Sequence, residues 1–409
     1  MKYVIIGNGI AGTSAAEMIR RLDASGAVTV VADETLAPYC RPMISMVLEG
    51  AVSAAQLPIR PADFYDKLRI EPIIGQRVST IDPANRTVAI GDRQTIPFDR
   101  LLIATGADPR PIKADNPHLR NIFFMRTQQQ VRGMLQALPT ARRALVLGGG
   151  LVGFKGAYGL LHRGLKVTML ISSGYPLSMQ VDAVAGRMIQ DELCARGLDV
   201  RVATQVVGFE GNGAVQRAIL ADGKEIPCDL VIIGKGVLPA LSSVPRDQIA
   251  VDLGILVDAH MQTTAPGIFA AGDVAEAVDI ARGARWVNAI WPEAVAQGRI
   301  AGINMAGRKV AYKGSLSRNV IRIFDLDVMT AGIVDVPADD GYEVVSAIDA
   351  RRKTYRKLVF REDRLVGMTL VNCIEQGGLL VALMQSETPV TMAKQKMVDS
   401  SFNYRQLMR

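Results

Sequence analysis

The chain has 409 residues, of which 49% are hydrophobic and 21% charged, and its formal net charge is +7. This composition predicts a globular protein with an ample core and two or three domains. The charge is too small to indicate nucleic acid as a partner, and no apolar run is long enough to cross a bilayer. Because no signal peptide precedes the first expected strand, we expect a soluble, cytoplasmic protein that has no membrane contact.

The chain opens with a strand, a glycine-rich turn and a helix. Residues 3–6 form an expected buried strand, and Gly7, Gly9 and Gly12 follow it in the spacing GxGxxG before a run rich in small residues. Glycines in this pattern let the backbone approach a dinucleotide, and the helix N-terminus attracts its pyrophosphate. We call residues 7–12 the first fingerprint.

The next elements extend this unit. A second expected strand, residues 28–31, ends just before Asp33 and Glu34. An acidic side chain at this place can accept a hydrogen bond from a ribose hydroxyl of the dinucleotide. Further along, residues 101–103 form a buried strand that runs into the small-residue turn 104–106. The pattern is typical of a βαβ dinucleotide-binding unit.

The same pattern returns later in the chain. A buried strand at residues 144–147 precedes Gly148, Gly150 and Gly153, again in the spacing GxGxxG, and a second strand follows at residues 166–171. We call residues 148–153 the second fingerprint. One such motif is weak evidence, but two in strand–turn–helix context indicate two dinucleotides and electron transfer between them.

The remaining elements are expected in the following order. A helix spans residues 182–196, a buried strand spans 230–233, a short strand ends at Gly272-Asp273, a small-residue helix spans about 293–307, alternating strands lie within 319–335, 342–349, 354–361 and 365–372, and an apolar helix spans about 374–385. A Met-rich amphipathic tail, residues 392–408, is expected to pack on its own domain or on another subunit.

The order of these motifs resembles one family. The motifs follow one another in this order: the first fingerprint, Arg41-Pro42-x-x-Ser45, the turn 104–106, the second fingerprint and Gly272-Asp273. This order resembles that of FAD/NAD(P)-dependent oxidoreductases of the pyridine nucleotide-disulfide oxidoreductase-like superfamily. Ferredoxin and rubredoxin reductases, NADH oxidases and the flavin portion of NADH nitrite reductases belong to this superfamily. The resemblance implies FAD on the first fingerprint and NAD on the second.

The resemblance also implies the fold. We expect an α/β protein with two Rossmann-like dinucleotide-binding domains, the NAD domain being inserted in the FAD domain, and a C-terminal α+β domain. The expected bounds are 1–108 and 237–310 for the FAD-binding domain, 109–236 for the NAD-binding domain and 311–409 for the C-terminal interface domain.

Site residues follow from the same resemblance. The residues implied to bind the two cofactors are Gly7, Gly9, Ile10, Ala11, Gly12, Asp33, Glu34, Arg41, Pro42, Val78, Ala104, Thr105, Gly106, Gly148, Gly150, Leu151, Val152, Gly153, Ser172, Gly236, Gly272, Asp273 and Pro292. The helix that starts near Pro292 is expected to direct its positive end at the flavin, and Trp291 to lie beside the flavin or the nicotinamide.

Two positions depart from the family pattern. Relatives carry a Lys after the Arg-Pro-x-x-Ser motif and a Glu two residues past the second fingerprint, and these two side chains form an ion pair beside the flavin. This chain has Met46 and Lys155 instead. Our hypothesis is that Lys155 supplies the missing positive charge and assists hydride transfer, while the alternative is a Lys155 side chain that extends into solvent.

The preferred nicotinamide cofactor is left open by the sequence. Ser172, Ser173 and Gly174 follow the second strand of the NAD unit, so this place offers neither an acid that selects NAD nor an Arg cluster for a 2′-phosphate. The intact Gly153 favours NAD, and NADP is not excluded.

Thiol chemistry is not expected. The four cysteines, Cys40, Cys194, Cys228 and Cys373, have no CxxC pair and no metal-ligand spacing, so we expect no metal site in this chain. Disulfide reductases need a cysteine pair near the flavin, and Cys40 has no such partner. Electrons that arrive as hydride should therefore leave singly, toward an iron–sulfur carrier.

The motifs around residues 39–45, 151–155 and 291–294 are most similar to FAD subunits of multi-subunit anaerobic oxidoreductases, such as phenylglyoxylate dehydrogenase or tungsten aldehyde oxidoreductases. We therefore expect an electron-transfer subunit of a hetero-oligomer with an iron–sulfur, ferredoxin-like partner. A free-standing NADH:rubredoxin or ferredoxin reductase is the second possibility, and an NADH oxidase or CoA-disulfide reductase is the third. Basic residues between 351 and 364 are interpreted as a solvated face or a docking patch for an acidic partner.

Overall fold

The computed structural model describes residues 1–91, 94–336, 341–391, 394–399 and 402–403. The chain forms two compact units: unit 1 comprises Met1–Pro42, Ala55–Asp108 and Val237–Leu316, and unit 2 comprises Met43–Ala54, Pro109–Gly236 and Ser317–Arg409. The chain thus leaves unit 1 after Asp108 and returns to it at Val237. Short strands β8 (Ala107–Pro109) and β17 (Val237–Pro239) pair at these two crossings.

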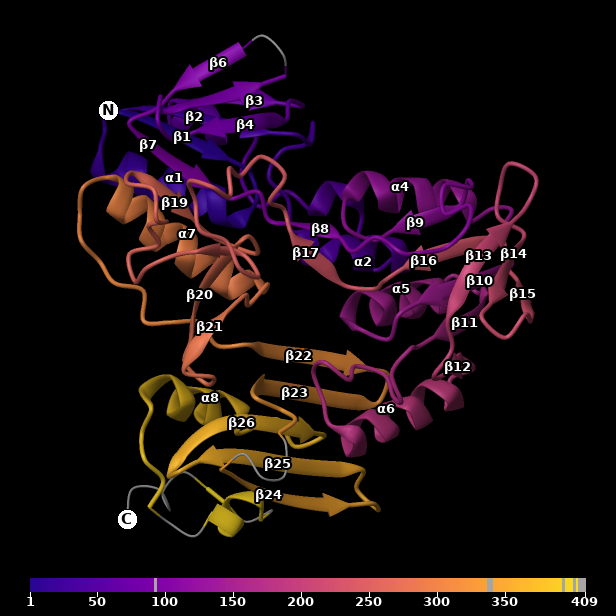
Figure 1. The fold of residues 1–409 in the computed structure, drawn as a ribbon. Coiled ribbons are helices and arrows are strands. Elements are labelled where there is room, and N and C mark those ends of the chain that lie inside the picture. Colours follow the sequence, from indigo (N-terminus) through magenta and orange to yellow (C-terminus); the bar gives the residue numbers. More distant parts are fainter. Residues whose placement is uncertain (92–93, 337–340, 392–393, 400–401, 404–409) are drawn as a thin grey trace. The chain divides into compact units, whose positions relative to one another are not determined.

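A five-stranded parallel sheet forms the centre of unit 1, with the strand order β19-β7-β1-β2-β3 (Figure 1). The strands are β1 (Lys2–Ile6), β2 (Ala27–Ala32), β3 (Ile70–Ile74), β7 (Arg100–Ile103) and β19 (Ile268–Ala270). β1, β2 and β7 are buried over nearly their whole length, as expected for parallel strands covered on both faces.

Two helices of unit 1, α1 (Ile10–Leu22) and α7 (Trp291–Met305), pack against each other with their backbones close together. A Cβ on Gly298 would lie 2.2 Å from the Ala11 carbonyl oxygen, and one on Gly302 would lie 2.5 Å from the Ala15 carbonyl oxygen. Glycines are required at these two positions because any side chain would separate the helices.

Smaller elements complete unit 1. An antiparallel sheet contains β4 (Val78–Asp82), β5 (Thr87–Ile90) and β6 (Gln94–Pro97), and another sheet contains β18 (Ile255–Leu256), β20 (Ala275–Asp279) and β21 (Ala284–Trp286). Short helical segments are η1 (Arg41–Met43), η2 (Ala54–Gln56) and α3 (Phe64–Lys67).

Unit 2 contains a second parallel sheet, with the order β12-β11-β10-β16-β9. Its strands are β9 (Ile122–Phe124), β10 (Arg143–Leu147), β11 (Lys166–Leu170), β12 (Asp199–Arg201) and β16 (Leu230–Ile233), its helices are α4 (Gln128–Ala137), α5 (Leu151–His162) and α6 (Ala183–Ala195), and a three-stranded antiparallel sheet holds β13 (Val206–Glu210), β14 (Arg217–Leu220) and β15 (Glu225–Pro227). Both units therefore contain the doubly wound core that the fingerprints predict.

The segment 43–54 belongs to unit 2, although the sequence analysis included it in the first domain. Its helix α2 (Ile44–Glu49) packs on α5, where Gly159 leaves room for the α2 backbone. Arg163 Nε donates to the Leu48 carbonyl oxygen at 2.8 Å and so caps this contact. Contacts distant in sequence, rather than any composition shift, assign α2 to unit 2.

The C-terminal part of unit 2 is an antiparallel sheet with the order β22-β23-β26-β25-β24. Its elements are β22 (Arg318–Ile323), β23 (Leu326–Gly332), β24 (Tyr342–Asp349), β25 (Thr354–Arg361), β26 (Arg364–Val371), α8 (Gly377–Ser386) and η3 (Lys394–Val398). The expected strand 319–335 is two strands, separated by a turn at Phe324, whose φ is +50°. Most of the Met-rich tail lies outside the described residues.

The basic residues between 351 and 364 do not form one solvated face. Arg356 and Lys357 are only 9% and 8% exposed. Arg356 donates to the carbonyl oxygen of Met397 at 3.1 Å, and Lys357 forms an ion pair with Asp182 at 3.0 Å. The docking-patch interpretation is therefore wrong for these two residues. A buried charged side chain needs a partner inside the protein, and Arg356 and Lys357 both have one, so neither faces an external partner.

Among the described residues, no helix combines the length and apolarity that crossing a membrane requires.

Candidate functional site

The first fingerprint forms a tight turn between β1 and α1. Gly7 has a φ of +109°, and a Cβ on it would lie 2.2 Å from the Ala104 carbonyl oxygen; a Cβ on Gly12 would lie 2.0 Å from the Gly7 carbonyl oxygen. In contrast, no described atom lies within 4 Å of the place where a Gly9 Cβ would be. Two glycines thus serve packing, and Gly9 leaves open space at the helix N-terminus.

The second fingerprint repeats this arrangement between β10 and α5. A Cβ on Gly148 would lie 2.4 Å from the Gly234 carbonyl oxygen, and one on Gly153 would lie 1.9 Å from the Gly148 carbonyl oxygen. No described atom lies within 4 Å of a Cβ placed on Gly150, which is the N-cap of α5. Gly148 and Gly153 thus serve packing and Gly150 leaves open space, so each of the two units contains one glycine turn with an open helix N-terminus.

Both helix N-termini fit a diphosphate. Gly9 and Gly150 cap α1 and α5 without any side-chain hydrogen bond, and the first turns of these two fully described helices contain no acidic residue. The first backbone N–H groups of any helix have no intrahelical acceptor, and here no side chain caps them. The space beside Gly9 and Gly150 is open, so a ligand can reach these groups. Such groups, together with the helix dipole, bind phosphate oxygens.

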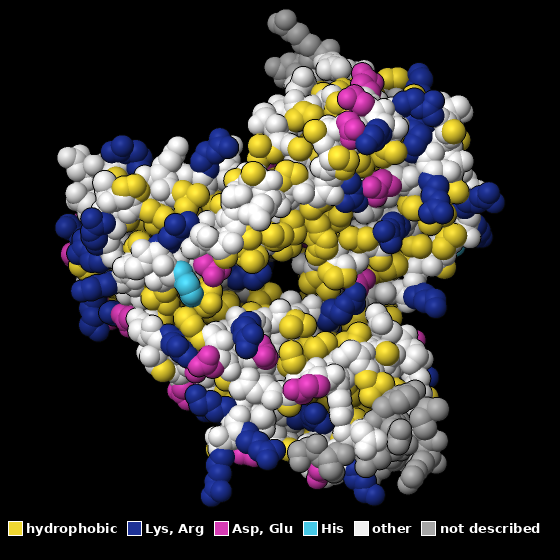
Figure 2. Space-filling model, turned by 180° about the vertical axis from the view of Figure 1, so that it is seen from behind, with side chains coloured by type: hydrophobic (Ala, Val, Ile, Leu, Met, Phe, Trp, Pro, Cys, Tyr) yellow, Lys and Arg dark blue, Asp and Glu magenta, His cyan; other side chains and the backbone are white. Residues whose placement is uncertain are grey.

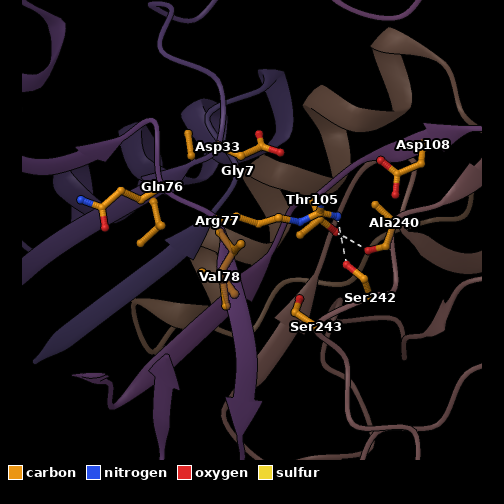
Figure 3. Close-up of a pocket in the computed structure, with 13 residues that line it drawn as sticks. Gly7, Asp33, Gln76, Arg77, Val78, Thr105, Asp108, Ala240, Ser242 and Ser243 are labelled. Carbon is orange, nitrogen blue, oxygen red and sulfur yellow. Dashed lines mark hydrogen bonds between the residues drawn. The ribbon is translucent and has the colours of Figure 1, made fainter. Parts of the chain in front are cut away.

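A pocket in unit 1 lies at the carboxyl ends of β1 and β2 (Figure 3). It is lined by Ile6, Gly7, Val31, Ala32, Asp33, Gln76, Arg77, Val78, Thr105, Asp108, Ala240, Ser242 and Ser243. Of the predicted residues, Gly7, Asp33, Val78 and Thr105 thus meet at one place. Dinucleotides bind at this edge of a parallel sheet, with the adenosine half beside the strand that follows the glycine turn.

The two candidate ribose acceptors occupy different positions. Asp33 is exposed and lines the pocket, as Figure 3 shows. Glu34 instead accepts hydrogen bonds from Arg41 at 2.5 Å and from the Tyr39 hydroxyl at 2.8 Å. Of the two acids, Asp33 therefore lines the pocket, while the Glu34 carboxylate is engaged by Arg41 and Tyr39.

Arg41 lies among oppositely charged groups of unit 1. Its burial lowers the pKa of the guanidinium, but Tyr39, Glu34 and Asp273 together raise that pKa above its ordinary value. The predicted cofactor residues Arg41 and Asp273 are therefore close enough to interact electrostatically.

The segment Gly272-Asp273 is attached to α7. The Gly272 N–H donates to Gln297 Oε1 at 2.8 Å, and Gln297 is 2% exposed. Trp291 is the first residue of α7, Pro292 follows it, and Glu293 in the same turn is buried and hydrogen-bonded to the Tyr312 hydroxyl. Proline suits this first turn because its missing N–H would have no intrahelical acceptor.

Near the second fingerprint, the predicted residues are spread over the ends of β11 and β16. Ser172 is exposed just after β11, and Gly236 has a φ of +89° with no described atom within 4 Å of its Cβ position. Lys155, in the second turn of α5, is half-buried. Lys235, which the sequence analysis did not single out, lies beside Gly148, and burial lowers its pKa.

Further pocket residues escaped the sequence analysis, namely Gln76, Arg77, Asp108, Ser242 and Ser243. Gln76 had a usable signal, since it follows β3, whose carboxyl end lies beside that of β2. Ser242 and Ser243 had none, because they come from a segment more than 200 residues away from the first fingerprint in the chain. Arg77 donates to the Ser242 hydroxyl at 3.1 Å and so joins the two segments.

Two family models match this chain, one over its first three quarters and one over its C-terminal part. Residues 1–298 match the model of the pyridine nucleotide-disulphide oxidoreductases, and residues 318–388 match that of the rubredoxin–NAD+ reductase C-terminal domain. The chain is similar to the epsilon subunit of NADH-dependent phenylglyoxylate dehydrogenase from Aromatoleum evansii, at 30% identity over 97% of this chain and 94% of that subunit.

Other relatives have different sizes. Rubredoxin–NAD(+) reductase from Pseudomonas putida is 26% identical over 93% of this chain and 98% of its own length. Nitrite reductase [NAD(P)H] from Bacillus subtilis is 28% identical over 95% of this chain, which spans only 48% of that relative. Among solved structures, the covalent putidaredoxin reductase–putidaredoxin complex matches with a TM-score of 0.91 and 25% identity, covering 100% of this chain and 98% of that one.

Proposed function

The chain belongs to the pyridine nucleotide-disulphide oxidoreductase family, and from this premise we propose that it is the NAD(H)-linked flavin subunit of a larger oxidoreductase. The family uses FAD and NAD(P)H, and the chain is an FAD-dependent NAD(P)H oxidoreductase. In this proposal it exchanges a hydride with NAD and single electrons with an iron–sulfur partner subunit. The partner subunits oxidise the substrate, an aldehyde or a 2-oxo acid.

One observation carries the subunit assignment: similarity to the phenylglyoxylate dehydrogenase epsilon subunit extends over 97% of this chain and 94% of that protein. A dehydrogenase subunit of nearly the same extent needs partners for the substrate chemistry. The two open glycine turns support the same proposal, because one polypeptide then holds two dinucleotides.

FAD, when bound, accepts an electron pair with a hydride and returns electrons one at a time. The chain's own residues supply binding and electrostatics. The N-termini of α1 and α5 bind the two pyrophosphates, and Asp33 accepts from the adenosine ribose. Arg41 and Asp273, together with Pro292 at the start of α7, bind the remainder of FAD. The positive end of α7 stabilises negative charge that develops during reduction.

Lys155 is the proposed source of positive charge for hydride transfer. The family pattern implies a Glu at this position and a pairing Lys at residue 46, whereas this chain has Lys155 and Met46. A Lys155→Met variant should reduce its flavin with NADH roughly tenfold more slowly, while it retains FAD, because a charge near the reacting atoms acts mainly on the transition state. An unchanged reduction rate would remove Lys155 from the proposed machinery.

Anaerobic stopped-flow spectroscopy of the FAD-loaded protein with NADH and with NADPH tests the hydride step. Rapid bleaching of the flavin absorbance by NADH, with slow reoxidation by air, is the expected result. Rapid oxygen consumption would instead indicate an oxidase. No bleaching by either nucleotide would contradict hydride transfer altogether.

A free-standing reductase of rubredoxin or ferredoxin is the second candidate function. The match of residues 318–388 to the rubredoxin–NAD+ reductase C-terminal domain favours it. Native purification separates the two possibilities. A subunit should co-elute with iron–sulfur polypeptides in fixed stoichiometry, whereas a free reductase should elute alone and reduce an added small iron–sulfur protein.

A further inference from the structure

A buried cluster in unit 2 joins α6 to the C-terminal sheet. Asp182, the N-cap of α6, is 6% exposed. Its Oδ1 accepts from the Ala185 N–H at 3.1 Å, while its Oδ2 accepts from the Tyr355 hydroxyl at 2.6 Å and lies 3.0 Å from Lys357 Nζ. One carboxylate thus caps a helix of the nucleotide domain and holds two side chains of β25.

The contact continues along both elements. Within β25, Tyr355 and Lys357 are two residues apart and so share one face of the strand, while Lys353 lies in the turn before it, with a φ of +51°. Lys353 Nζ lies 3.6 Å from Glu192, a residue of α6 that is only 5% exposed. Asp182 at the N-cap and Glu192 within α6 are ten residues apart, a helical rise of about 15 Å, and each lies near one lysine. Lys357 is buried, whereas the Lys353 side chain is 65% exposed, so the buried part of the contact is the one at Asp182.

The buried Asp182 carboxylate is stabilised by both of its β25 partners, the Tyr355 hydroxyl and the Lys357 ammonium group. Tyr355 is 4% exposed, and burial, followed by the hydrogen bond to Asp182, raises the pKa of its hydroxyl. Tyr355 therefore stays protonated and donates. Lys357 also donates to the Val334 carbonyl oxygen at 2.9 Å. Removal of Lys357 would leave the Asp182 carboxylate buried without its counter-charge, which proteins tolerate poorly.

Asp182 also ends the loop that follows β11, residues 171–181. The Leu177 N–H donates to the Gly149 carbonyl oxygen at 2.8 Å, inside the second fingerprint. Tyr175 packs on α6, where a Cβ on Gly186 would lie 2.2 Å from its ring. The loop is therefore fixed at the fingerprint on one side and at α6 on the other, and in this fold the start of this loop contacts the adenosine ribose of a dinucleotide.

We propose that Tyr355 and Lys357 are positioning residues for NAD(P)H, which act through Asp182 and the loop 171–181 on the second fingerprint. The C-terminal domain then has a role in nucleotide affinity besides any role in partner binding. This inference rests on the proposed use of the second fingerprint for NAD(P)H.

The test compares Tyr355→Phe and Lys357→Met with the wild-type holoprotein. Calorimetry with NAD+ and with ADP-ribose should show dissociation constants raised about five- to twentyfold, because the ordered loop is lost while the fingerprint itself remains. KM for NADH should rise in parallel, and the limiting rate of flavin reduction should change less than twofold. Lys357→Arg should restore most of the affinity, since it retains the charge.

Lys394→Met is the matched control. Lys394 is also largely buried in the C-terminal domain and forms ion pairs with the exposed Glu343 at 2.7 Å and Asp363 at 3.4 Å, but these partners do not belong to α6. Wild-type affinity in both test variants, or an equal loss in the control, would overturn the inference. Tyr355→Phe removes only one oxygen, so it covers the case in which Lys357→Met does not fold. A wild-type protein that binds neither NAD+ nor ADP-ribose would instead contradict the proposed function.

Discussion

At the scale of single residues, the glycines of each fingerprint divide into two classes. Gly12 and Gly153 leave 2.0 Å and 1.9 Å between a new Cβ and a backbone carbonyl oxygen, so they are required for folding. Gly9 and Gly150 meet no described atom within 4 Å, so the space beside them is free for a ligand. Glycine is therefore needed for packing at one position of the motif and leaves room for a ligand at another.

This division predicts separable variants. Gly9→Ala should fold normally but bind FAD at least tenfold more weakly, because the methyl group occupies the pyrophosphate space. Gly150→Ala should keep its FAD and weaken only NADH binding. Flavin absorbance per protein and a nucleotide titration measure both effects. Thermal unfolding of the apoproteins is the control, and a melting temperature well below that of the wild type would mean that these glycines also serve packing.

At the scale of elements, the contact between α1 and α7 joins the first fingerprint to the segment Gly272-Asp273. Gly298 and Gly302 let the two helix backbones approach, and Gln297 on the same helix receives the Gly272 N–H. Helix α7 thus connects the helix that follows the first fingerprint to the segment Gly272-Asp273. Small residues in this helix have a positional function that helix propensity alone would not favour.

Gly302→Ala tests this packing. The new methyl group would lie 2.5 Å from the Ala15 carbonyl oxygen, so we expect a loss of about 1–3 kcal/mol in the free energy of unfolding, together with weaker FAD retention. Gly378→Ala in α8 is the control, because no described atom lies within 4 Å of its Cβ position. That change should be neutral or stabilise by up to about 1 kcal/mol. Equal effects in denaturant titrations of the two variants would contradict the packing argument.

At the scale of the whole molecule, the distribution of positive charge bears on the choice of partner. On the face shown in Figure 2, Lys and Arg side chains are spread among hydrophobic, acidic and other side chains instead of forming one block. The net charge of +7 still favours an acidic carrier through long-range attraction. Internal partners hold Arg356 and Lys357, so these two do not contribute a docking surface.

We therefore predict a moderate salt dependence of electron transfer. The second-order rate for reduction of an acidic ferredoxin-type acceptor should fall about three- to tenfold between 50 mM and 300 mM salt, because screening shortens the range of attraction. Reduction of a neutral quinone by the same NADH-reduced protein provides the comparison and should change little. A ferredoxin rate that is insensitive to salt would exclude electrostatic steering as a contribution to partner selection.

The sequence by itself determined the two fingerprints, their strand–turn–helix context and the order of most elements, because glycine spacing and continuous apolar runs are local properties of the chain. It also indicated Gly7, Asp33, Val78 and Thr105, which meet in one pocket. Only the tertiary structure decided which acid is available, since Glu34 is engaged by Arg41 and Tyr39 through contacts that no periodicity reveals.

Tertiary structure likewise decided whether the basic residues in β25 are buried and to which unit the helix α2 belongs. Strand alternation predicts which side chains share a face, but it does not say whether water or another element covers that face. Here the buried carboxylate of Asp182, the N-cap of α6, receives Lys357, whereas Lys353 reaches the buried Glu192 but its side chain stays 65% exposed. Pairings between residues about 170 apart depend on how the domains pack, and packing is a property of the folded chain rather than of any one segment.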